Sequence, residues 1–247
     1  MVDYRNGWAV ALCACALAGP LAAEKPPALY LPFDRSLADR GSNRFAVAAQ
    51  GDGIALATGG VFGGSVFIAG SGDWIDVAVD KHLSLQKGAT LAFWFQRDDW
   101  ENPYKGGSGW QTLANIDGMT LNVTAPGCPS HKPWTLEGTI SRFAGELNGD
   151  TSRAIVRSEA GMISPRTWFH VALTYNPGLS NAILYVNGEQ VDVASNAPLP
   201  RAEFVNPFRV GTWYKSNQAF RGWVDEVKIY DYPLGPAEVA REVNLGP

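Results

Sequence analysis

The sequence has few groups that could cross-link the chain. Its 247 residues include only three cysteines, and two of them, Cys13 and Cys15, lie near the N-terminus. If that segment is removed on export, as argued below, Cys128 is the single thiol that remains. An intramolecular disulfide is then impossible, and the fold must be held together by its apolar core.

Motifs for common catalytic chemistries are also missing. The three histidines, His82, His131 and His170, show neither the HExxH pattern nor another spacing typical of metal ligands. No glycine-rich phosphate loop follows a predicted strand, and no Gly-x-Ser-x-Gly motif occurs. The sequence therefore gives no local signal for a zinc hydrolase, a nucleotide-binding enzyme or a serine hydrolase.

Positive charge is neither abundant nor clustered. The chain has 20 Lys and Arg residues against 24 Asp and Glu residues, which gives a formal net charge of -4. A protein that follows a phosphate backbone needs a basic patch or stripe. Because the basic residues here are scattered, we do not expect nucleic acid to be a partner.

The one marked apolar run lies at the start of the chain and has the features of an export signal. Arg5 gives a positive start, residues 8–17 form the apolar run, and small residues follow up to Ala22 and Ala23. The run is too short for a membrane-spanning helix, which needs about 20 apolar residues. We expect residues 1–23 to be a signal peptide and the product to be secreted or periplasmic.

A second processing site can be recognised inside this segment. Leu12-Cys13-Ala14-Cys15 comes close to a bacterial lipoprotein site, in which Cys15 would carry the lipid. The apolar stretch before Cys15 is very short for that purpose, so we favour ordinary cleavage. The choice matters because a lipid would tether the domain to a membrane, although a single acyl chain anchors only weakly.

The rest of the chain is dominated by short segments in which side chains alternate between two faces. In Thr90–Gln96, the apolar residues Leu91, Phe93 and Phe95 share one face, and Phe169–Tyr175 alternates in the same way. Gly, Pro, Asn and Asp separate these segments, and helical periodicity is almost absent. The pattern predicts an all-β protein.

The clearest turn signal is Asn187-Gly188, which sits between two alternating runs in Ile183–Val193 and predicts a hairpin with a two-residue turn. Further strands are predicted at Leu29–Phe33, Val66–Ile68, Trp74–Val79, Thr112–Ile116, Thr120–Val123, Thr135–Phe143, Ala154–Ser158, Phe208–Val210 and Gly222–Tyr230. Gly235 and Pro236 suit the start of one short amphipathic helix at the C-terminal end. A two-sheet antiparallel β-sandwich with this helix as a cap is the expected fold, in one domain over residues 27–245.

Seven segments resemble, in their order, the motifs of laminin-G-like, concanavalin A-like lectin/glucanase domains. They are Leu31–Asp34, Gly70–Val77, Ala89–Phe95, Trp168–Tyr175, Leu184–Gly188, Val210-Gly211 and Phe220–Tyr230. The resemblance extends to the closing helix and implies a jelly-roll sandwich of the concanavalin A-like type. Residues 96–165 depart from the family pattern, because this stretch is longer than a minimal member needs. We interpret it as an insertion that builds a specific binding surface.

The resemblance leaves several functions open, since the fold hosts lectins, adhesion modules and glycosidases. Related glucanases carry a Glu-x-Asp-x-x-Glu pattern on one strand face, and this pattern is absent here. Asp225-Glu226 is the nearest acidic pair, but strand alternation predicts that the two side chains point to opposite faces. We expect a non-catalytic binding protein, with a polysaccharide-cleaving glycosidase or lyase built from loop residues as the alternative.

Aromatic residues in loops are the candidate ligand-binding groups, because sugar rings stack on flat apolar surfaces. Trp74, Trp94, Trp168 and Trp223 lie in strand motifs, where packing explains them. The residues predicted to bind ligand are Trp100, Tyr104, Trp110, Trp134, Trp213, Tyr214 and Asn217. Plugging the ends of the sandwich is the alternative role of the loop aromatics. The expected partner is a glycan or polysaccharide, and an extracellular protein is the alternative.

Calcium is the second expected ligand, because many domains that resemble this one use it. Hard cations bind several carboxylate and carbonyl oxygens. Asp34, Asp39 and Asn43 form an acidic turn after the first strand, and Asp225 lies on the last strand. The first and last strands lie side by side in the family, which would bring Asp34 near Asp225. Turn formation by the carboxylates of Asp34 and Asp39 is the alternative.

Overall fold

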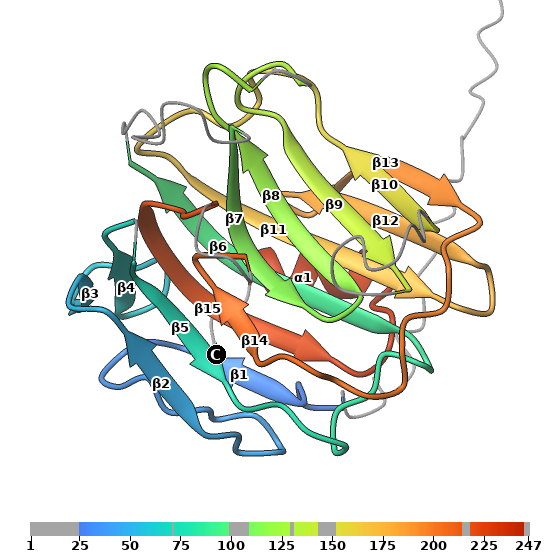
Figure 1. The fold of residues 1–247 in the computed structure, drawn as a ribbon, viewed down its shortest axis with the longest axis horizontal. Coiled ribbons are helices and arrows are strands. Elements are labelled where there is room, and N and C mark those ends of the chain that lie inside the picture. Colours follow the sequence, from blue (N-terminus) through green and yellow to red (C-terminus); the bar gives the residue numbers. More distant parts are fainter. Residues whose placement is uncertain are drawn as a thin grey trace, which may run out of the picture.

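The computed structural model describes residues 25–70, 72–98, 109–128, 131–142, 152–213 and 218–244 (Figure 1). The predicted signal peptide lies outside these residues, and so do four predicted ligand-binding residues, Trp100, Tyr104, Tyr214 and Asn217. Within the described ranges, no helix is long and apolar enough to cross a membrane.

Two antiparallel sheets make up the fold. Sheet A has the strand order β13-β12-β11-β6-β15-β4-β3, with β1 paired to β15 as well. Its strands are β1 (Leu29–Leu31), β3 (Ile54–Ala57), β4 (Ser65–Ile68), β6 (Ala89–Arg97), β11 (Trp168–Asn176), β12 (Asn181–Val186), β13 (Glu189–Ser195) and β15 (Gly222–Tyr230). Sheet B has the order β10-β9-β8-β7-β14-β5-β2. Its strands are β2 (Val47–Gln50), β5 (Trp74–Val77), β7 (Trp110–Ile116), β8 (Met119–Thr124), β9 (Leu136–Ser141), β10 (Arg153–Arg157) and β14 (Phe208–Val210).

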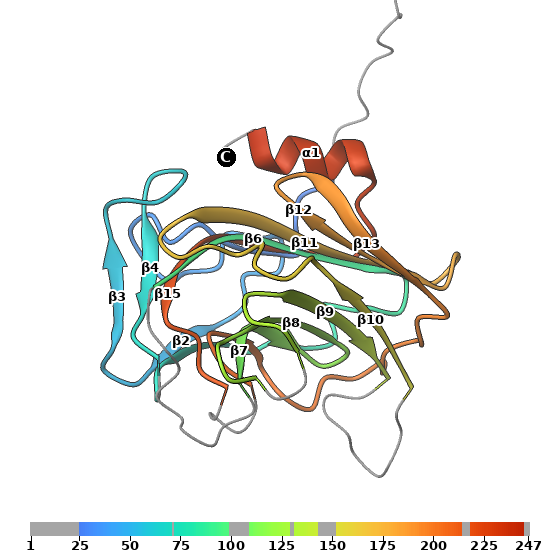
Figure 2. The same ribbon diagram turned by 90° about the horizontal axis from the view of Figure 1, so that it is seen from above.

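The apolar faces of the two sheets pack against each other, so the core lies between two layers (Figure 2). Leu91, Phe93 and Phe95 of β6 are buried in this core, as their alternation predicts, and Phe208 and Val210 meet them from sheet B. Burying each such side chain contributes about 1.5–3 kcal/mol. The predicted all-β, two-sheet fold class is confirmed.

The predicted hairpin and helix are also confirmed. Asn187 and Gly188 have φ angles of 51° and 85°, which the two-residue turn between β12 and β13 requires. Helix α1 (Pro236–Asn244) begins after Gly235, whose carbonyl accepts the N–H groups of Glu238 and Val239. Helix α1 lies on the outer side of sheet A (Figure 2).

Two strands were not predicted from the sequence, and both lie at a sheet edge. Strand β2 ends sheet B and β3 ends sheet A, and no residue of either strand is buried. An edge strand that buries little has no need of a regular apolar alternation, so the sequence signal is weak.

The long stretch 96–165 is a structural part of the sandwich. It supplies β7, β8, β9 and β10, which form one side of sheet B. Leu113, Leu121, Ile140 and Val156 of these strands are fully buried in the core. The described part of this stretch therefore belongs to the packed sheet.

Candidate functional site

Polar side chains form a row across four strands on the outer face of sheet B. Thr112 of β7 pairs with Asn122 of β8, and Asn122 pairs with Glu137 of β9. Glu137 in turn pairs with Arg157 of β10. Because successive strand residues point to opposite faces, the four side chains share the outer face of the sheet, where Thr112 is fully buried and Glu137 is 6% exposed.

Side-chain contacts connect the members of this row. Arg157 Nε donates to Glu137 Oε2 at 2.7 Å, and the two side chains are 39% and 8% exposed. Thr112 Oγ1 lies 2.8 Å from Asn122 Oδ1 and 3.0 Å from Gln218 Oε1. The carboxylate of Glu137 is thus fixed by a partly exposed guanidinium, which has five N–H donors in all.

Trp110 stands beside the row. It is the first residue of β7 and pairs with Thr124, so it points to the same face as Thr112, two residues later. Its ring centroid lies 4.8 Å from that of His131, and His131 Nε2 lies 3.8 Å from Glu137 Oε2. A partly exposed indole therefore lies beside an imidazole, and this imidazole connects it to the carboxylate of the row.

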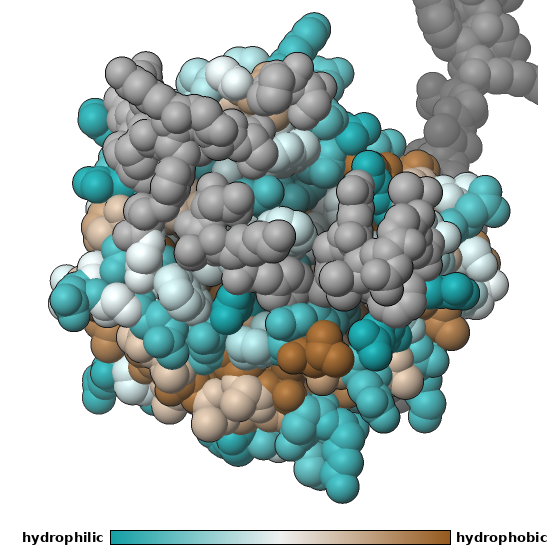
Figure 3. Space-filling model, in the orientation of Figure 1, coloured by the Kyte–Doolittle hydropathy of each residue, from teal (hydrophilic) through white to brown (hydrophobic). Residues whose placement is uncertain are grey.

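We call this group of side chains the sheet-B site. Its members are Trp110, Thr112, Asn122, His131, Glu137, Arg157 and Gln218. Figure 3 views the molecule from the side of sheet B, and the described surface in the upper part of the view is mostly hydrophilic. Brown, hydrophobic atoms gather lower in the view, in the region of β5, β14 and β1.

Three of the aromatic residues predicted to bind ligand are described, and they differ in their surroundings. Trp110 belongs to the sheet-B site. Trp213 lies in the connection between β14 and β15. Backbone hydrogen bonds join both ends of this connection to β7: Gly211 N donates to Leu113 O, and Thr112 N donates to Gln218 O.

Trp134 plugs one end of the sandwich. Its ring packs against the core, and the guanidinium carbon of Arg97 lies 3.4 Å from the ring centroid. Arg97 is 3% exposed, and its Nε donates to the carbonyl of Ile163 at 2.9 Å. The geometry gives Trp134 a structural contact, which is the alternative role that the sequence leaves open for loop aromatics.

The sequence did not single out Thr112, Asn122, Glu137 or Arg157 as binding residues. A signal for them exists, because every second residue of β8 is polar, and so is every second residue of β9. Such alternation predicts a solvent-facing polar surface. It does not predict which residues of different strands stand opposite each other, and that register brings the row together.

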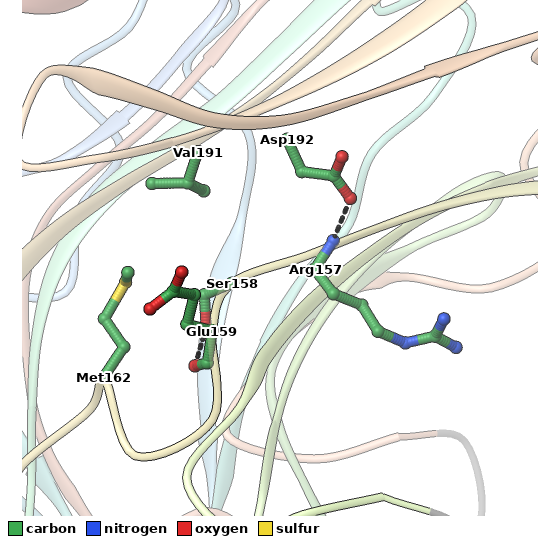
Figure 4. Close-up of a pocket in the computed structure, with 6 residues that line it drawn as sticks. All are labelled: Arg157, Ser158, Glu159, Met162, Val191 and Asp192. Atoms are coloured by element: carbon green, nitrogen blue, oxygen red, sulfur yellow. Dashed lines mark hydrogen bonds between the residues drawn. The ribbon is translucent and has the colours of Figure 1, made fainter.

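A pocket of about 440 Å³ lies next to the sheet-B site, at the edge where β10 approaches β13 (Figure 4). Its lining residues are Arg157, Ser158, Glu159, Met162, Val191 and Asp192. Asp192 Oδ2 accepts the backbone N–H of Arg157 at 2.8 Å, which ties the two sheets together. The guanidinium of Arg157 points away from Met162 and Val191, toward Glu137 on the outer face.

The prediction that Asp225 and Glu226 point to opposite faces is wrong. A register shift between Asp225 and Lys228 places a bulge in β15, and Glu226 has a φ of 55°. Strict alternation would place Asp225 on the same face as Val227, but the bulge separates them, because Asp225 pairs with Trp94, outside the core, while Val227 lies in the core.

The bulge brings both carboxylates to the outer side of sheet A, beneath the loop 59–64. Asp225 Oδ2 accepts the N–H groups of Val61 and Phe62, at 2.8 and 3.1 Å. Burial raises the pKa of Asp225 to about 7 and also raises the pKa of Glu226. Raised pKa values are typical of catalytic acids, but the two residues are 0% and 3% exposed, so a sugar chain has no access to them.

Glu226 is held by two further groups. Its carboxylate accepts the hydroxyl of Tyr30 at 2.9 Å and lies 3.3 Å from Lys228 Nζ. The side chain of Lys228 is 11% exposed, and its Nζ also donates to Glu242 Oε2 of α1. This buried network connects the first strand, the last strand and the helix.

The four residues predicted to bind calcium fall into two groups. Asp39 accepts the backbone N–H groups of Tyr30, Gly41 and Phe45, and Asn43 Nδ2 donates to His82 O. The contacts of Asp39 are those of a turn, and Asn43 links this turn to His82, 39 positions further along the chain. The described residues hold no cluster of three or more His, Cys, Asp or Glu side chains that could bind a metal ion.

Asp34 and Asp225 form the other group, at the loop 59–64. As expected, β1 pairs with β15, and Asp34 Oδ1 accepts the N–H of Gly64 while Asp225 holds the N–H groups of Val61 and Phe62. Asp225 Oδ1 is buried without a hydrogen-bond partner. Two carboxylates are fewer oxygen ligands than a calcium ion takes, so they do not by themselves make a complete calcium site.

The chain matches the family described as the concanavalin A-like lectin/glucanases superfamily over residues 69–240, which is more than half of its length. The protein therefore belongs to this superfamily, as its motifs indicate. A search of curated protein sequences found no match.

Similar solved structures include binding domains of clostridial toxins. The binding domain of Paraclostridial Mosquitocidal Protein 1 is 17% identical with a TM-score of 0.68, and the match covers 89% of this chain and 52% of that chain. The binding domain of botulinum neurotoxin DC in complex with SialylT is 14% identical, with a TM-score of 0.65 and coverages of 89% and 51%. The ligand-binding domain of botulinum neurotoxin serotype D in complex with N-acetylneuraminic acid is 16% identical, with a TM-score of 0.65 and coverages of 88% and 50%. The chain thus spans about half the length of these structures, and the likeness shows the fold.

Proposed function

We propose that the protein is a non-catalytic carbohydrate-binding protein whose ligand lies on the sheet-B site. The observation that carries the proposal is the placement of Trp110 beside the row that runs from Thr112 to Arg157. The superfamily and the glycan complexes of two structural neighbours support the ligand class. The predicted signal peptide supports a secreted or periplasmic location.

The chemistry of the site suits a sugar. The apolar face of an indole stacks on the C–H groups of a pyranose ring, and hydroxyl groups need both donors and acceptors around the ring. Arg157 supplies donors and the amide of Asn122 supplies both donors and acceptors, while the largely buried Glu137 holds the guanidinium of Arg157 in place. These groups are fixed by cross-strand contacts, so little side-chain entropy is lost when a ligand binds.

Among the residues that the structure describes, the acidic side chains Glu137 and Asp76 of this face do not form the carboxylate pair that glycosidases use. Glu137 is fixed by Arg157, and Asp76, another acidic residue of this face, is paired with Arg209 at 2.8 Å. Strands β9 and β5 are four positions apart in sheet B, which separates these carboxylates by about 19 Å. Glycosidases place their two carboxyl groups about 5–9.5 Å apart. This arrangement supports binding without catalysis.

Replacing Trp110 with alanine is expected to weaken glycan binding about 10- to 100-fold, because the stacking surface is lost. A glycan array identifies a ligand of the unaltered protein, and titration calorimetry with that glycan measures the change. Trp134→Ala is the matched control, since its ring contacts the core and Arg97. Equal affinities of the unaltered protein and Trp110→Ala would remove the sheet-B site from the proposal. If no glycan binds and cross-linking recovers one extracellular protein, the adhesion function replaces it.

We further propose that the protein binds calcium through Asp34 and Asp225, together with carbonyl oxygens of the loop 59–64. The support is that both carboxylates contact this loop and that Asp225 Oδ1 is buried and unpartnered. Calcium titrated into chelator-treated protein is then expected to release or absorb heat and to raise the melting temperature, and Asp34→Asn is expected to weaken both effects. No heat and an unchanged melting temperature would rule out the ion.

A further inference from the structure

Among the residues that the structure describes, helix α1 covers only part of the outer face of sheet A. Helix α1 packs on Ala92, Ala172, Tyr185 and Tyr230 through Val239 (Figure 2). Trp168 lies four residues before Ala172 on β11. It is therefore about 13 Å along the strand from the residues that helix α1 contacts. No helix within the described ranges lies over this end of the sheet.

Aromatic side chains form a second row on this end of sheet A. Trp168 of β11 pairs with Gln96 of β6, Gln96 pairs with Trp223 of β15, and Trp223 pairs with Phe67 of β4. All four alternate with core residues, and all four are partly exposed. We call Trp168, Gln96, Trp223 and Phe67 the aromatic row of sheet A.

The row has a regular spacing across the sheet. Trp168 and Trp223 are separated by one strand, so the two indoles stand about 10 Å apart, with the amide of Gln96 between them. Phe67 extends the apolar surface, because its ring centroid lies 4.8 Å from that of Trp223. The whole row crosses four strands and is about 14 Å long.

Charged groups at the end of the row neutralise each other. The guanidinium carbon of Arg221 lies 5.7 Å from the Phe67 ring, and its Nε donates to Asp98 Oδ2 at 2.8 Å. Both side chains are partly exposed, at 36% and 23%. The row therefore presents aromatic rings, an amide and a paired ion, with no excess charge among these residues.

This composition fits an extended chain of neutral sugars better than a charged ligand. Trp168 and Trp223 lie on either side of the strand that carries Gln96. The two indoles can therefore stack on alternate pyranose units, while the amide of Gln96 bonds to the hydroxyls of the unit between them. A nucleic acid or an acidic glycan would need unpaired positive charge, which the Arg221–Asp98 pair does not supply.

We propose that the aromatic row of sheet A is a second carbohydrate-binding surface, which takes an extended chain of neutral pyranose units across the strands. The row lies on the opposite face of the sandwich from the sheet-B site, so one molecule has two binding faces that point in opposite directions. This inference goes beyond the proposed function, because the row can bind without the sheet-B site. Two opposed faces would let the protein cross-link polysaccharide chains, with the gain in avidity that two linked sites give.

The test measures binding to soluble hydroxyethyl cellulose, xylan, galactomannan and laminarin by affinity electrophoresis. The unaltered protein is expected to bind at least one of them, and Trp168→Ala and Trp223→Ala are each expected to weaken that binding at least 10-fold. Trp223→Phe keeps a ring at the same position and is expected to retain most of the affinity, and melting curves check that each variant is folded.

The outcomes separate this inference from the proposed function. Loss of polymer binding in Trp223→Ala with no loss in Trp110→Ala supports the aromatic row and counts against the sheet-B site. The opposite result overturns the aromatic row and leaves the sheet-B site in place. Absence of binding to all four polymers, or equal binding by Trp223→Ala and the unaltered protein, also overturns the inference.

Discussion

Asp225→Asn is expected to make the protein more stable than the unaltered chain at pH 8, and about equally stable at pH 4. Asp225 is fully buried, and burial raises its pKa from 3.8 to about 7. Well below pH 3.8 the carboxyl is protonated in both the folded and the unfolded state, so its ionisation costs no stability there, and at pH 4 the cost is still small. Between pH 4 and 7 the unfolded chain ionises first, and the free energy of unfolding falls as the pH rises.

The loss is complete above the folded-state pKa and is of the order of 2–4 kcal/mol. An asparagine at this position still accepts the N–H groups of Val61 and Phe62 but carries no charge. Urea unfolding of the two proteins at pH 4, 6 and 8, in the presence of a chelator, measures the difference. Asp34→Asn is the control, because Asp34 is exposed. A difference between Asp225→Asn and the unaltered protein that is the same at every pH would contradict this account.

Trp134→Ala is expected to lower the free energy of unfolding by about 2–4 kcal/mol. The substitution removes the ring that packs on the core and covers the guanidinium of Arg97, which lies 3.4 Å from the ring centroid. Arg97 is 3% exposed, so without the ring its charge would face a cavity. Denaturant midpoints measure the loss.

A double-mutant cycle isolates the contact between the two side chains. Trp134→Phe keeps an aromatic face over the guanidinium and is expected to lose less stability than Trp134→Ala. In Arg97→Met, removal of the Trp134 ring is expected to cost less than in the unaltered protein, by about 0.5–2 kcal/mol. An additive cycle would mean that the ring acts through packing alone.

Much of the fold could be predicted because the sandwich buries one side of nearly every strand. Leu91, Phe93 and Phe95 alternate with outward residues, and they lie in the core as their period requires. The Asn187-Gly188 turn and the Pro236 helix start depend on local backbone preferences, so they also are visible in the sequence. Local patterns fail where the chain departs from a regular period.

The bulge at Glu226 is the clearest such departure. One extra residue in β15 changes which face of the sheet Asp225 and its neighbours point to. No sequence pattern around Glu226 predicts this bulge. The sheet-B site is a related case. Trp110 could be recognised as a candidate, but its neighbours Glu137 and Arg157 are 27 and 47 positions further along the chain, and only the strand register brings them together.

The position of β15 affects how the protein can be made on the ribosome. This last strand stands in the middle of sheet A, where it pairs with β1, β4 and β6. Strands β1, β4 and β6 are synthesised before β15. Each of them therefore has an unpaired edge until about residue 230 has left the ribosomal exit tunnel. Sheet A cannot be completed before β15 is available, and β1, β4 and β6 are the segments that a chaperone would have to protect until then.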